Sequence, residues 1–245
     1  MGGGVRSVKA ERTGRVEQEM KMKAIDVMVR DVVTVGPDDD VADAIKLLAE
    51  FDVSALPVVE EDDKVIGIIS EADLVRRPEI GTEKHRAWWL EALTPGSTLA
   101  EEFAKAHGRR VSEVMSTDVV SAGEDASLGE IATLLEKHRI KRVPILRDGR
   151  LVGIVSRSNL IQALASTQAG NGTDTDGDRE IREALLDRLD DQSWTDFGSR
   201  NVIVAGGVVH LWGLVGSAEE RKALLALAEE VPGVTRVSDE MIPAY

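Results

Sequence analysis

The chain has 245 residues, a formal net charge of −14 at pH 7 and no cysteine. Without cysteine it can form neither disulfides nor thiolate metal sites, and its acidic charge opposes contact with nucleic acid or anionic lipid. No apolar run reaches the roughly 18 residues that a membrane-spanning helix needs. We therefore expect a cytoplasmic protein with no nucleic-acid partner and no membrane partner.

Residues 1–22 have no apolar core, so they do not read as a secretory signal, and we expect a disordered extension. An internal repeat organises the next part of the chain. Its two copies, 23–77 and 109–166, match at a spacing of 87 residues until one residue is lost in a turn. The matching segments are Val27-Met28 with Val114-Met115, Pro57 with Pro144, and Gly67-Ile68-Ile69-Ser70 with Gly153-Ile154-Val155-Ser156.

Each copy predicts a strand, a helix, two strands and a second helix. A unit of about 50 residues buries little core by itself, which favours pairing of the two copies. The first strand is expected at Val32–Val35, before an acidic turn. The first helix presents an apolar face at helical spacing, formed by Val41, Ala44, Ile45 and Leu48 in one copy and by Leu128, Ile131, Ala132 and Leu135 in the other. The later strands are expected at Leu56–Val59, Val65–Ile69, Val143–Leu146 and Leu151–Val155.

Two connecting segments differ in character. Residues 78–108 contain Trp88 and Trp89 in an amphipathic run and predict a helical linker, whose tryptophans we expect to pack against the repeats. Residues 167–177 are polar and rich in glycine, which predicts a flexible linker.

The C-terminal residues, 178–245, predict a third module with the order helix, strand, strand, helix, strand. Gly206-Gly207 is a hairpin turn, and Ser217 with Glu220 forms a capping box at the start of the second helix. The elements are expected at about Arg179–Asp190, Asn201–Ala205, Val208–Leu214, Ala218–Val231 and Val234–Ile242.

The repeats resemble the cystathionine-beta-synthase (CBS) domain family, through the Val-Met opening, Lys141-Arg142-Val143-Pro144 and Gly67-Ile68-Ile69-Ser70-Glu71-Ala72-Asp73. The C-terminal module resembles the BON domain, through the segments around Gly206-Gly207 and Pro232-Gly233. These resemblances imply an α/β (α+β) fold. Tandem CBS repeats would pack as a pseudo-twofold disc with two equivalent clefts, and a small αββαβ BON module would follow. They also imply a homodimer formed through the CBS pair.

The CBS resemblance further implies an adenosine ligand in a cleft, such as AMP, ADP, ATP or S-adenosylmethionine, with no tightly bound cofactor. Ser70 and Ser156 stand at strand-to-helix junctions, where free backbone N–H groups favour phosphate. Simple helix capping is an open alternative for both junctions. The contact residues that the resemblance implies are Thr34, Val35, Ala55, Pro57, Ser70, Asp73, Ser121, Ala122, Lys141, Arg142, Pro144, Ser156 and Asn159.

The two clefts are not expected to be equal. The run His138-Arg139-Ile140-Lys141-Arg142 is the best local basic cluster, and it reads either as a phosphate site or as a solvated helix end. The first repeat has Ser54 and Ala55 where the second has Lys141 and Arg142. We expect the cleft that uses Asp73 to bind better, with phosphates reaching the basic residues of the second repeat.

Catalytic and metal-binding patterns are missing from the sequence. The four histidines have no zinc-site spacing, and there is neither a phosphate-binding Walker motif nor a nucleophile elbow. Asp174, Asp176 and Asp178 begin like a calcium loop, but Arg179 and Leu185 stand where glycine and glutamate are needed. We expect no enzyme activity.

The leading hypothesis is a regulatory sensor of adenosine nucleotides that signals to an unidentified protein partner through the BON tail. One alternative is a ligand-free dimeric scaffold, and another is a phospholipid-associated envelope protein driven by the BON module. Within residues 178–243 there are thirteen acidic and seven basic residues. We therefore expect no binding to anionic membranes, where each basic residue contributes only about 1 kcal/mol.

Overall fold

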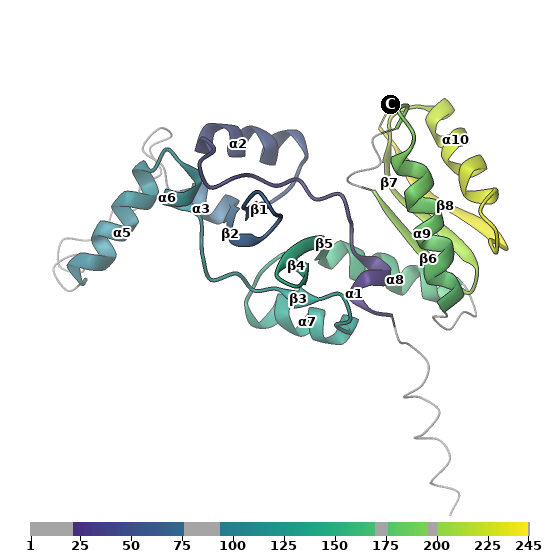
Figure 1. Ribbon diagram of the computed structural model, residues 1–245, viewed down its shortest axis with the longest axis horizontal. Helices are drawn as coiled ribbons and strands as arrows, with labels where there is room; N and C mark the ends of the chain where they lie inside the picture. The colour runs from purple at the N-terminus through teal and green to yellow at the C-terminus, as the bar shows by residue number, and fades with distance from the viewer. Residues whose placement is uncertain (1–21, 76–93, 170–175, 196–199, 245) are drawn as a thin grey trace, which may run out of the picture. The chain divides into compact units, whose positions relative to one another are not determined.

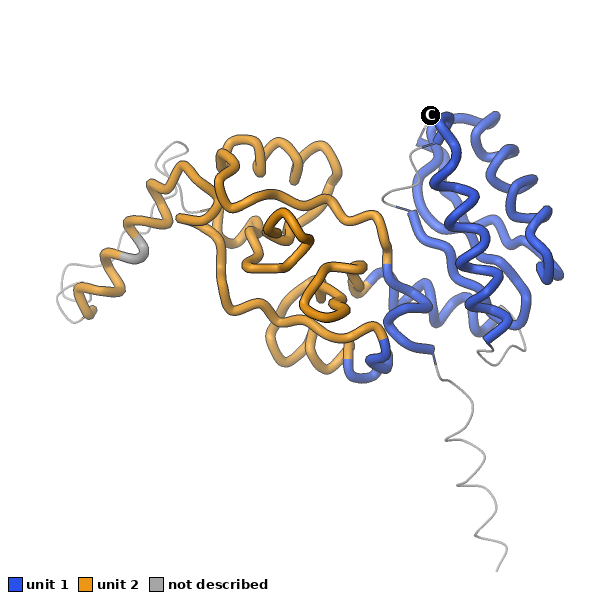
Figure 2. Tube along the Cα trace, in the orientation of Figure 1, with its two compact units in different colours: residues 1–28, 125–130, 158–245 blue, residues 29–124, 131–157 orange. Residues whose placement is uncertain are grey.

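The computed structural model describes residues 22–75, 94–169, 176–195 and 200–244. The chain divides into two compact units (Figures 1 and 2). Unit 1 contains Met1–Met28, Asp125–Glu130 and Ser158–Tyr245, and unit 2 contains Val29–Glu124 and Ile131–Arg157. The predicted extension lies outside the described residues except for Met22, and so does the tryptophan run of the first linker.

Apart from the first strand of the first repeat and the short helices α1 and α6, which were not predicted, the elements of the two repeats follow the predicted order, because each apolar run is bounded by turn residues that end it. The first repeat contains α1 (Ala24–Val27), α2 (Val41–Glu50), β1 (Ala55–Val59), β2 (Val65–Ser70) and α3 (Glu71–Leu74). The second contains α6 (Val111–Val114), β3 (Ala122–Gly123), α7 (Leu128–Lys137), β4 (Arg142–Arg147), β5 (Arg150–Ser156) and α8 (Arg157–Ala169). Helix α5 (Gly96–His107) lies in the predicted helical linker.

Two details of the first repeat were predicted wrongly. The strand expected at Val32–Val35 is reduced to Val35, which pairs only with Val58 of β1 among the described residues. Pro37 lies two residues further on and has no N–H to extend that pairing. Ile45 was assigned to the apolar face of α2, but it is 44% exposed whereas Val41 and Ala44 are buried. The buried face of α2 is therefore narrower than its periodicity indicates.

Pairing of the repeats is visible in their cores and hydrogen bonds. The core of the first repeat packs α2, β1 and β2 against Val111 and Val114, which belong to α6 of the second repeat. Several β-bridges join the repeats in unit 2. The Ile68–Ser116 and Val29–Ile154 bridges are equivalent at the spacing of the sequence repeat, and the Lys64–Arg150 bridge joins two residues that are each other's equivalents. Asp40 also bridges to Arg110. The repeats are thus related by a pseudo-twofold axis, as predicted.

The C-terminal module has the predicted order of elements. Its sheet has the order β6 (Asn201–Ala205), β7 (Val208–Val215) and β8 (Arg236–Pro243), with β6 antiparallel and β8 parallel to β7. Helices α9 (Asp176–Asp190) and α10 (Ala218–Glu229) cover one face of this sheet with an apolar core. Within the predicted linker 167–177, α8 continues to Ala169 and α9 begins at Asp176.

Polar side chains fix the turns of this module. Ser217 accepts a hydrogen bond from the Glu220 N–H at 3.0 Å, which confirms the predicted cap of α10. Asp178, which was considered for a calcium loop, is buried and accepts the N–H groups of Gly206 and Gly207 at 2.9 and 2.8 Å. Its carboxylate therefore holds the β6–β7 turn, where positive φ angles favour glycine.

The second face of the sheet is buried in part, whereas Leu214 and Ile242 at its edge are 58% and 62% exposed. It carries Asn201, Ile203 and His210, all of which are nearly inaccessible to solvent. Burial lowers the pKa of the His210 imidazole, and a contact with Glu240 opposes that effect. Two elements lie near this face within unit 1, α1 and α8, and both accept hydrogen bonds from Asn201 or Trp212 of the sheet. No helix in the described part of the chain is long and apolar enough to cross a membrane.

Candidate functional site

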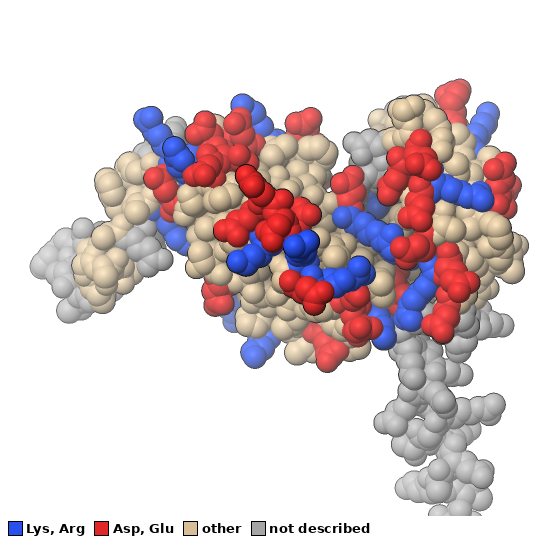
Figure 3. Space-filling view, viewed as in Figure 1, with Lys and Arg blue, Asp and Glu red and all other residues tan. Residues whose placement is uncertain are grey.

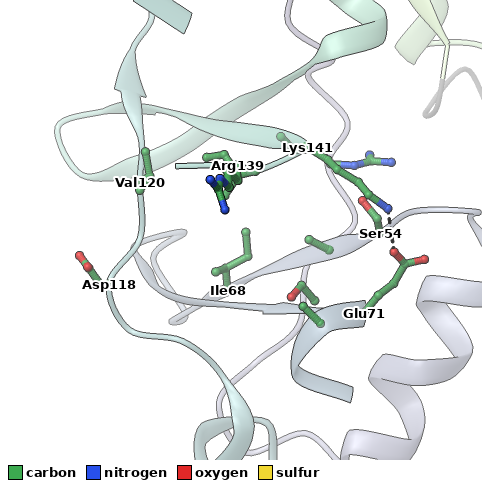
Figure 4. Close-up of a pocket in the computed structure, with 12 residues that line it drawn as sticks. Ser54, Ile68, Glu71, Asp118, Val120, Arg139 and Lys141 are labelled. Carbon is green, nitrogen blue, oxygen red and sulfur yellow. Dashed lines mark hydrogen bonds and ion pairs between the residues drawn. The ribbon is translucent and has the colours of Figure 1, made fainter. Parts of the chain in front are cut away.

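Unit 2 contains a hollow of about 230 Å³ whose walls come from both repeats (Figure 4). Typical ligand pockets measure about 300–1,000 Å³, so part of a nucleotide bound here would extend into solvent. The apolar side chains of Ile68 and Val120 lie on one side of the hollow, and Lys141 and Glu71 lie on the other (Figure 4). The lining residues are Ser54, Ala55, Ile68, Ser70, Glu71, Ala72, Asp118, Val120, Arg139, Ile140, Lys141 and Arg142.

The junction between β2 and α3 positions one wall. Ser70 ends the strand, and both its N–H and its hydroxyl donate to Asp73 Oδ2, at 3.0 and 2.6 Å. Asp73 Oδ1 accepts the Ser116 hydroxyl at 3.1 Å, and Lys105 Nζ lies 4.0 Å from the same oxygen. Asp73 thus caps a helix that extends only to Leu74 in the described residues. The capping alternative is present in the structure, and the ribose contact stays a prediction.

The opposite wall is built by the loop that follows α7. Arg139 has a φ of +54°, the left-handed conformation that commonly ends a helix. The N–H groups of Arg139 and Ile140 bond to the carbonyls of Glu136 and Leu135, at 3.2 and 3.1 Å. This turn stops the helix shortly before β4, and the basic side chains of Arg139, Lys141 and Arg142 all line the hollow.

The basic side chains face two carboxylates in the same hollow. Lys141 Nζ contacts Glu71 Oε2 at 3.0 Å, and both side chains are largely exposed, so this ion pair contributes little to stability. Burial lowers the pKa of the Arg142 guanidinium, while the charges of Asp52 and Glu71 oppose that effect. Arg142 still carries its charge near neutral pH because an arginine titrates only at very high pH. The lining residues thus include three cations and two acids, Glu71 and Asp118, and the charge of Asp52 also acts on Arg142.

The structure brings together only some of the residues predicted from the family resemblance. Ala55, Ser70, Lys141 and Arg142 line this hollow, and Asp73 lies directly behind Ser70. Pro57 and Pro144 are buried within β1 and β4. Ser121 and Ala122 follow Val120, which does line the hollow.

Thr34 and Val35 lie elsewhere, on a second and more open hollow of about 840 Å³. Its other walls carry five carboxylates and no basic residue, so it disfavours phosphate. These acids are Asp38, Asp39, Glu60, Glu61 and Asp62.

The second junction differs from the first. Ser156 ends β5 in unit 2, whereas Asn159 belongs to the part of α8 in unit 1. Asn159 is 5% exposed, and its Nδ2 donates to Gln162 Oε1 at 3.2 Å. The predicted role of these two residues in a second cleft stays a prediction.

Eight lining residues were not among the predicted contacts, namely Ser54, Ile68, Glu71, Ala72, Asp118, Val120, Arg139 and Ile140. Glu71 could have been found from the sequence, because it follows Ser70 at the junction itself. Arg139 had been noted in the basic run but not assigned to the cleft. The sequence did not indicate that Asp118 and Val120 line the hollow, since an acid and a valine before a short strand are ordinary surface and core residues.

The described residues contain no group of three His, Cys, Asp or Glu side chains arranged for a metal ion. On the face drawn in Figure 3, Lys and Arg side chains are interleaved with Asp and Glu rather than gathered into one basic surface. Arg139, Lys141 and Arg142 in the lining can form charge-assisted hydrogen bonds with an anionic group.

Comparison with known proteins identifies the domains. The CBS domain matches residues 24–79 and 111–166, and the BON domain matches residues 177–242. The CBS domain-containing protein YhcV of Bacillus subtilis is 31% identical over 147 residues, which cover 60% of this chain and 89% of YhcV. Inosine-5'-monophosphate dehydrogenase of Methanocaldococcus jannaschii is 34% identical over 148 residues, which are 60% of this chain but only 24% of the dehydrogenase. The chain thus spans about a quarter of that enzyme, through its CBS region.

Among solved structures, CBSX2 in complex with AMP superimposes with a TM-score of 0.51 and 26% identity. The superposition covers 58% of this chain and 96% of CBSX2, a protein of Arabidopsis thaliana. The likeness therefore spans the length of the CBS pair.

Proposed function

Because the chain belongs to the family of CBS-domain proteins and carries two CBS domains followed by a BON domain, we propose that it is a regulatory nucleotide-binding protein. It binds an anionic adenine nucleotide in the hollow lined by both repeats and signals to a protein partner through the BON domain. The observation that carries this proposal is the convergence of Arg139, Lys141 and Arg142 on one wall of that hollow.

The charge of the hollow narrows the ligand class. Guanidinium and ammonium groups form strong, charge-assisted hydrogen bonds with phosphate oxygens. The apolar side chains of Ile68 and Val120 offer a surface for an uncharged base (Figure 4). AMP, ADP and ATP fit both features, whereas S-adenosylmethionine would place a sulfonium cation near three basic side chains. The AMP complex of CBSX2 supports the same ligand class.

The test is a thermal-shift and calorimetric titration of the full chain with AMP, ADP, ATP, S-adenosylmethionine and unphosphorylated adenosine. At a ligand concentration 100 times the Kd, binding stabilises the native state by about 2.7 kcal/mol. For this length that raises Tm by about 5–10 °C. We expect the phosphorylated ligands to give this shift and adenosine to give a smaller one. No shift with any compound at millimolar concentration would favour the scaffold alternative.

A homodimer belongs to the same proposal. Ile161 and Leu164 on α8 are 66% and 48% exposed, and large apolar side chains of this kind are common at interfaces between subunits. We expect the full chain to have twice its mass of 26.5 kDa in solution. Light scattering at tens of micromolar protein would measure it, and a single-chain mass would contradict the dimer.

A further inference from the structure

The Glu71 side chain lines the hollow but was not among the contacts predicted from the sequence. Glu71 begins α3 directly after Ser70, and its Oε2 pairs with Lys141 Nζ at 3.0 Å (Figure 4). Burial lowers the pKa of the Arg142 guanidinium, and Glu71 is one of two carboxylates whose charge opposes that effect. Glu71 therefore acts on two of the three basic side chains that line the hollow.

The fold does not require an acid at position 71. The equivalent residue of the second repeat is Arg157. The Glu71 N–H donates to the Ser54 carbonyl at 3.1 Å, and the Arg157 N–H makes the equivalent bond to the Lys141 carbonyl at 3.4 Å. The strand-to-helix junction thus forms with either sign of charge. The ion pair of Glu71 with Lys141 is too exposed to contribute much stability, so the carboxylate is better explained by the hollow it lines.

The basic side chains of the hollow are opposed by acids before any ligand binds. Three cations line it together with Glu71 and Asp118, and the charge of Asp52 also acts on Arg142. Asp118 lies on the side of the hollow opposite Lys141, whereas Glu71 lies beside Lys141 (Figure 4). A phosphate that reaches Lys141 therefore meets the negative charge of Glu71 as well, and like charges repel. Each further phosphate adds to this repulsion, and the lining residues offer it no fourth cation.

We propose that Glu71 is a specificity-determining residue that selects a nucleoside monophosphate over the corresponding di- and triphosphate. The proposal rests on the proposed function, because it concerns the ligand of the same hollow. A bound phosphate displaces the carboxylate from Lys141, which the exposure of both side chains, 56% for Glu71 and 69% for Lys141, makes easy. The displaced carboxylate stays close to the anion. Its repulsion rises with the charge of the ligand, so it weakens ATP more than AMP.

The test is calorimetry of the full chain and of Glu71→Gln with AMP, ADP and ATP, without divalent cations. We expect the parent chain to bind AMP most tightly. The substitution keeps the size of the side chain and removes its charge, so we expect affinity to rise about threefold for AMP and about tenfold for ATP. Tm should change by less than about 4 °C, because an exposed ion pair contributes little.

Glu60→Gln is the matched control for the loss of one negative charge. Glu60 also belongs to an exposed ion pair of the first repeat, with Lys64 at 3.8 Å, and it does not line this hollow. We expect this variant to leave the ratio of ATP affinity to AMP affinity unchanged. The same ratio in Glu71→Gln and Glu60→Gln would show that Glu71 does not select the ligand, while the proposed function stands.

Three other outcomes are informative. Weaker AMP binding in Glu71→Gln would show that Glu71 supports the ligand, and the inference would be wrong. A parent chain that binds ATP as tightly as AMP would also contradict it. If none of the three nucleotides binds the parent chain or either variant, the proposed function fails and the role of Glu71 fails with it.

Discussion

The equivalent loops of the two repeats have the same backbone and opposite charge. Asp52 and Arg139 occupy matching positions after α2 and α7, with φ angles of +48° and +54°. The N–H of the next residue returns to the helix in both, from Val53 to Leu48 and from Ile140 to Leu135, at 3.1 Å each. The side chains differ, however, since Asp52, Ser54 and Ala55 correspond to Arg139, Lys141 and Arg142.

This difference separates what the fold requires from what the site requires. A left-handed residue after each helix ends it and starts the next strand, and glycine would do this with less strain. Neither loop uses glycine, and only the second loop is basic. The positive charge is therefore not needed for the backbone turn, and its concentration on one hollow favours a role in ligand binding. Asp52 contributes an opposing charge, because it attracts Arg142.

The largest effect is expected when the second loop, which contains Arg139, Lys141 and Arg142, is given the side chains of the first loop. We expect the triple variant Arg139→Asp, Lys141→Ser, Arg142→Ala to weaken AMP binding at least about a hundredfold, since each hydrogen bond between charged partners contributes about 1.5–3 kcal/mol. Calorimetry measures the affinity. Arg150→Ala is the control, because Arg150 is also an exposed cation of the second repeat but does not line the hollow. Equal affinities of the triple variant and the parent would show that phosphate binds elsewhere.

The strand-to-helix junctions offer a second, smaller test. Asp73 and Asn159 are equivalent, so Asp73→Asn makes the first junction resemble the second. The amide retains one acceptor for the bonds from Ser70 and Ser116 but loses its charge, and we expect a loss of about 1 kcal/mol in the free energy of unfolding. Asp73→Ala removes every acceptor and should cost about 2 kcal/mol, or about 4–8 °C in Tm. Urea unfolding of the ligand-free chain measures both free energies, and thermal unfolding measures the change in Tm. A melting temperature unchanged by Asp73→Ala would show that the cap is energetically unimportant.

The smallest expected effect comes from relieving the backbone strain of Asp52 and Arg139, the two loop residues with positive φ. Arg139→Gly should stabilise the ligand-free chain by about 0.5–1 kcal/mol, because glycine adopts positive φ without strain, yet weaken AMP binding severalfold. Asp52→Gly is the matched variant at the equivalent position. It should give a smaller gain in stability, since aspartate tolerates this conformation better, and should not weaken AMP binding. If both variants change affinity equally, the loop backbone rather than the charge of Arg139 governs binding.

Much of this organisation could be predicted from the sequence because it depends on local pattern. The repeat spacing, the two apolar strands of each repeat and the order of the BON elements follow from periodicity and turn residues, which act within a few positions of the chain. The prediction was wrong at Val32–Val35 for a tertiary reason. Those valines look like a strand, but only Val35 meets a partner in β1 among the described residues.

The sequence by itself determined most of the segments that form helices and strands, that the repeats are equivalent, and that the second loop is the more basic. Only the tertiary structure decided which of the predicted contact residues lie together in one hollow. It brought Ser70 and Lys141 to one hollow and left Thr34 on another. It also buried Arg182 and Asn201, whose residue types usually lie at the surface. Both donate hydrogen bonds to carbonyl groups at the end of α1. The reason is that a helix end must find donors in three dimensions, and the element that supplies them can lie more than 150 residues away in the sequence.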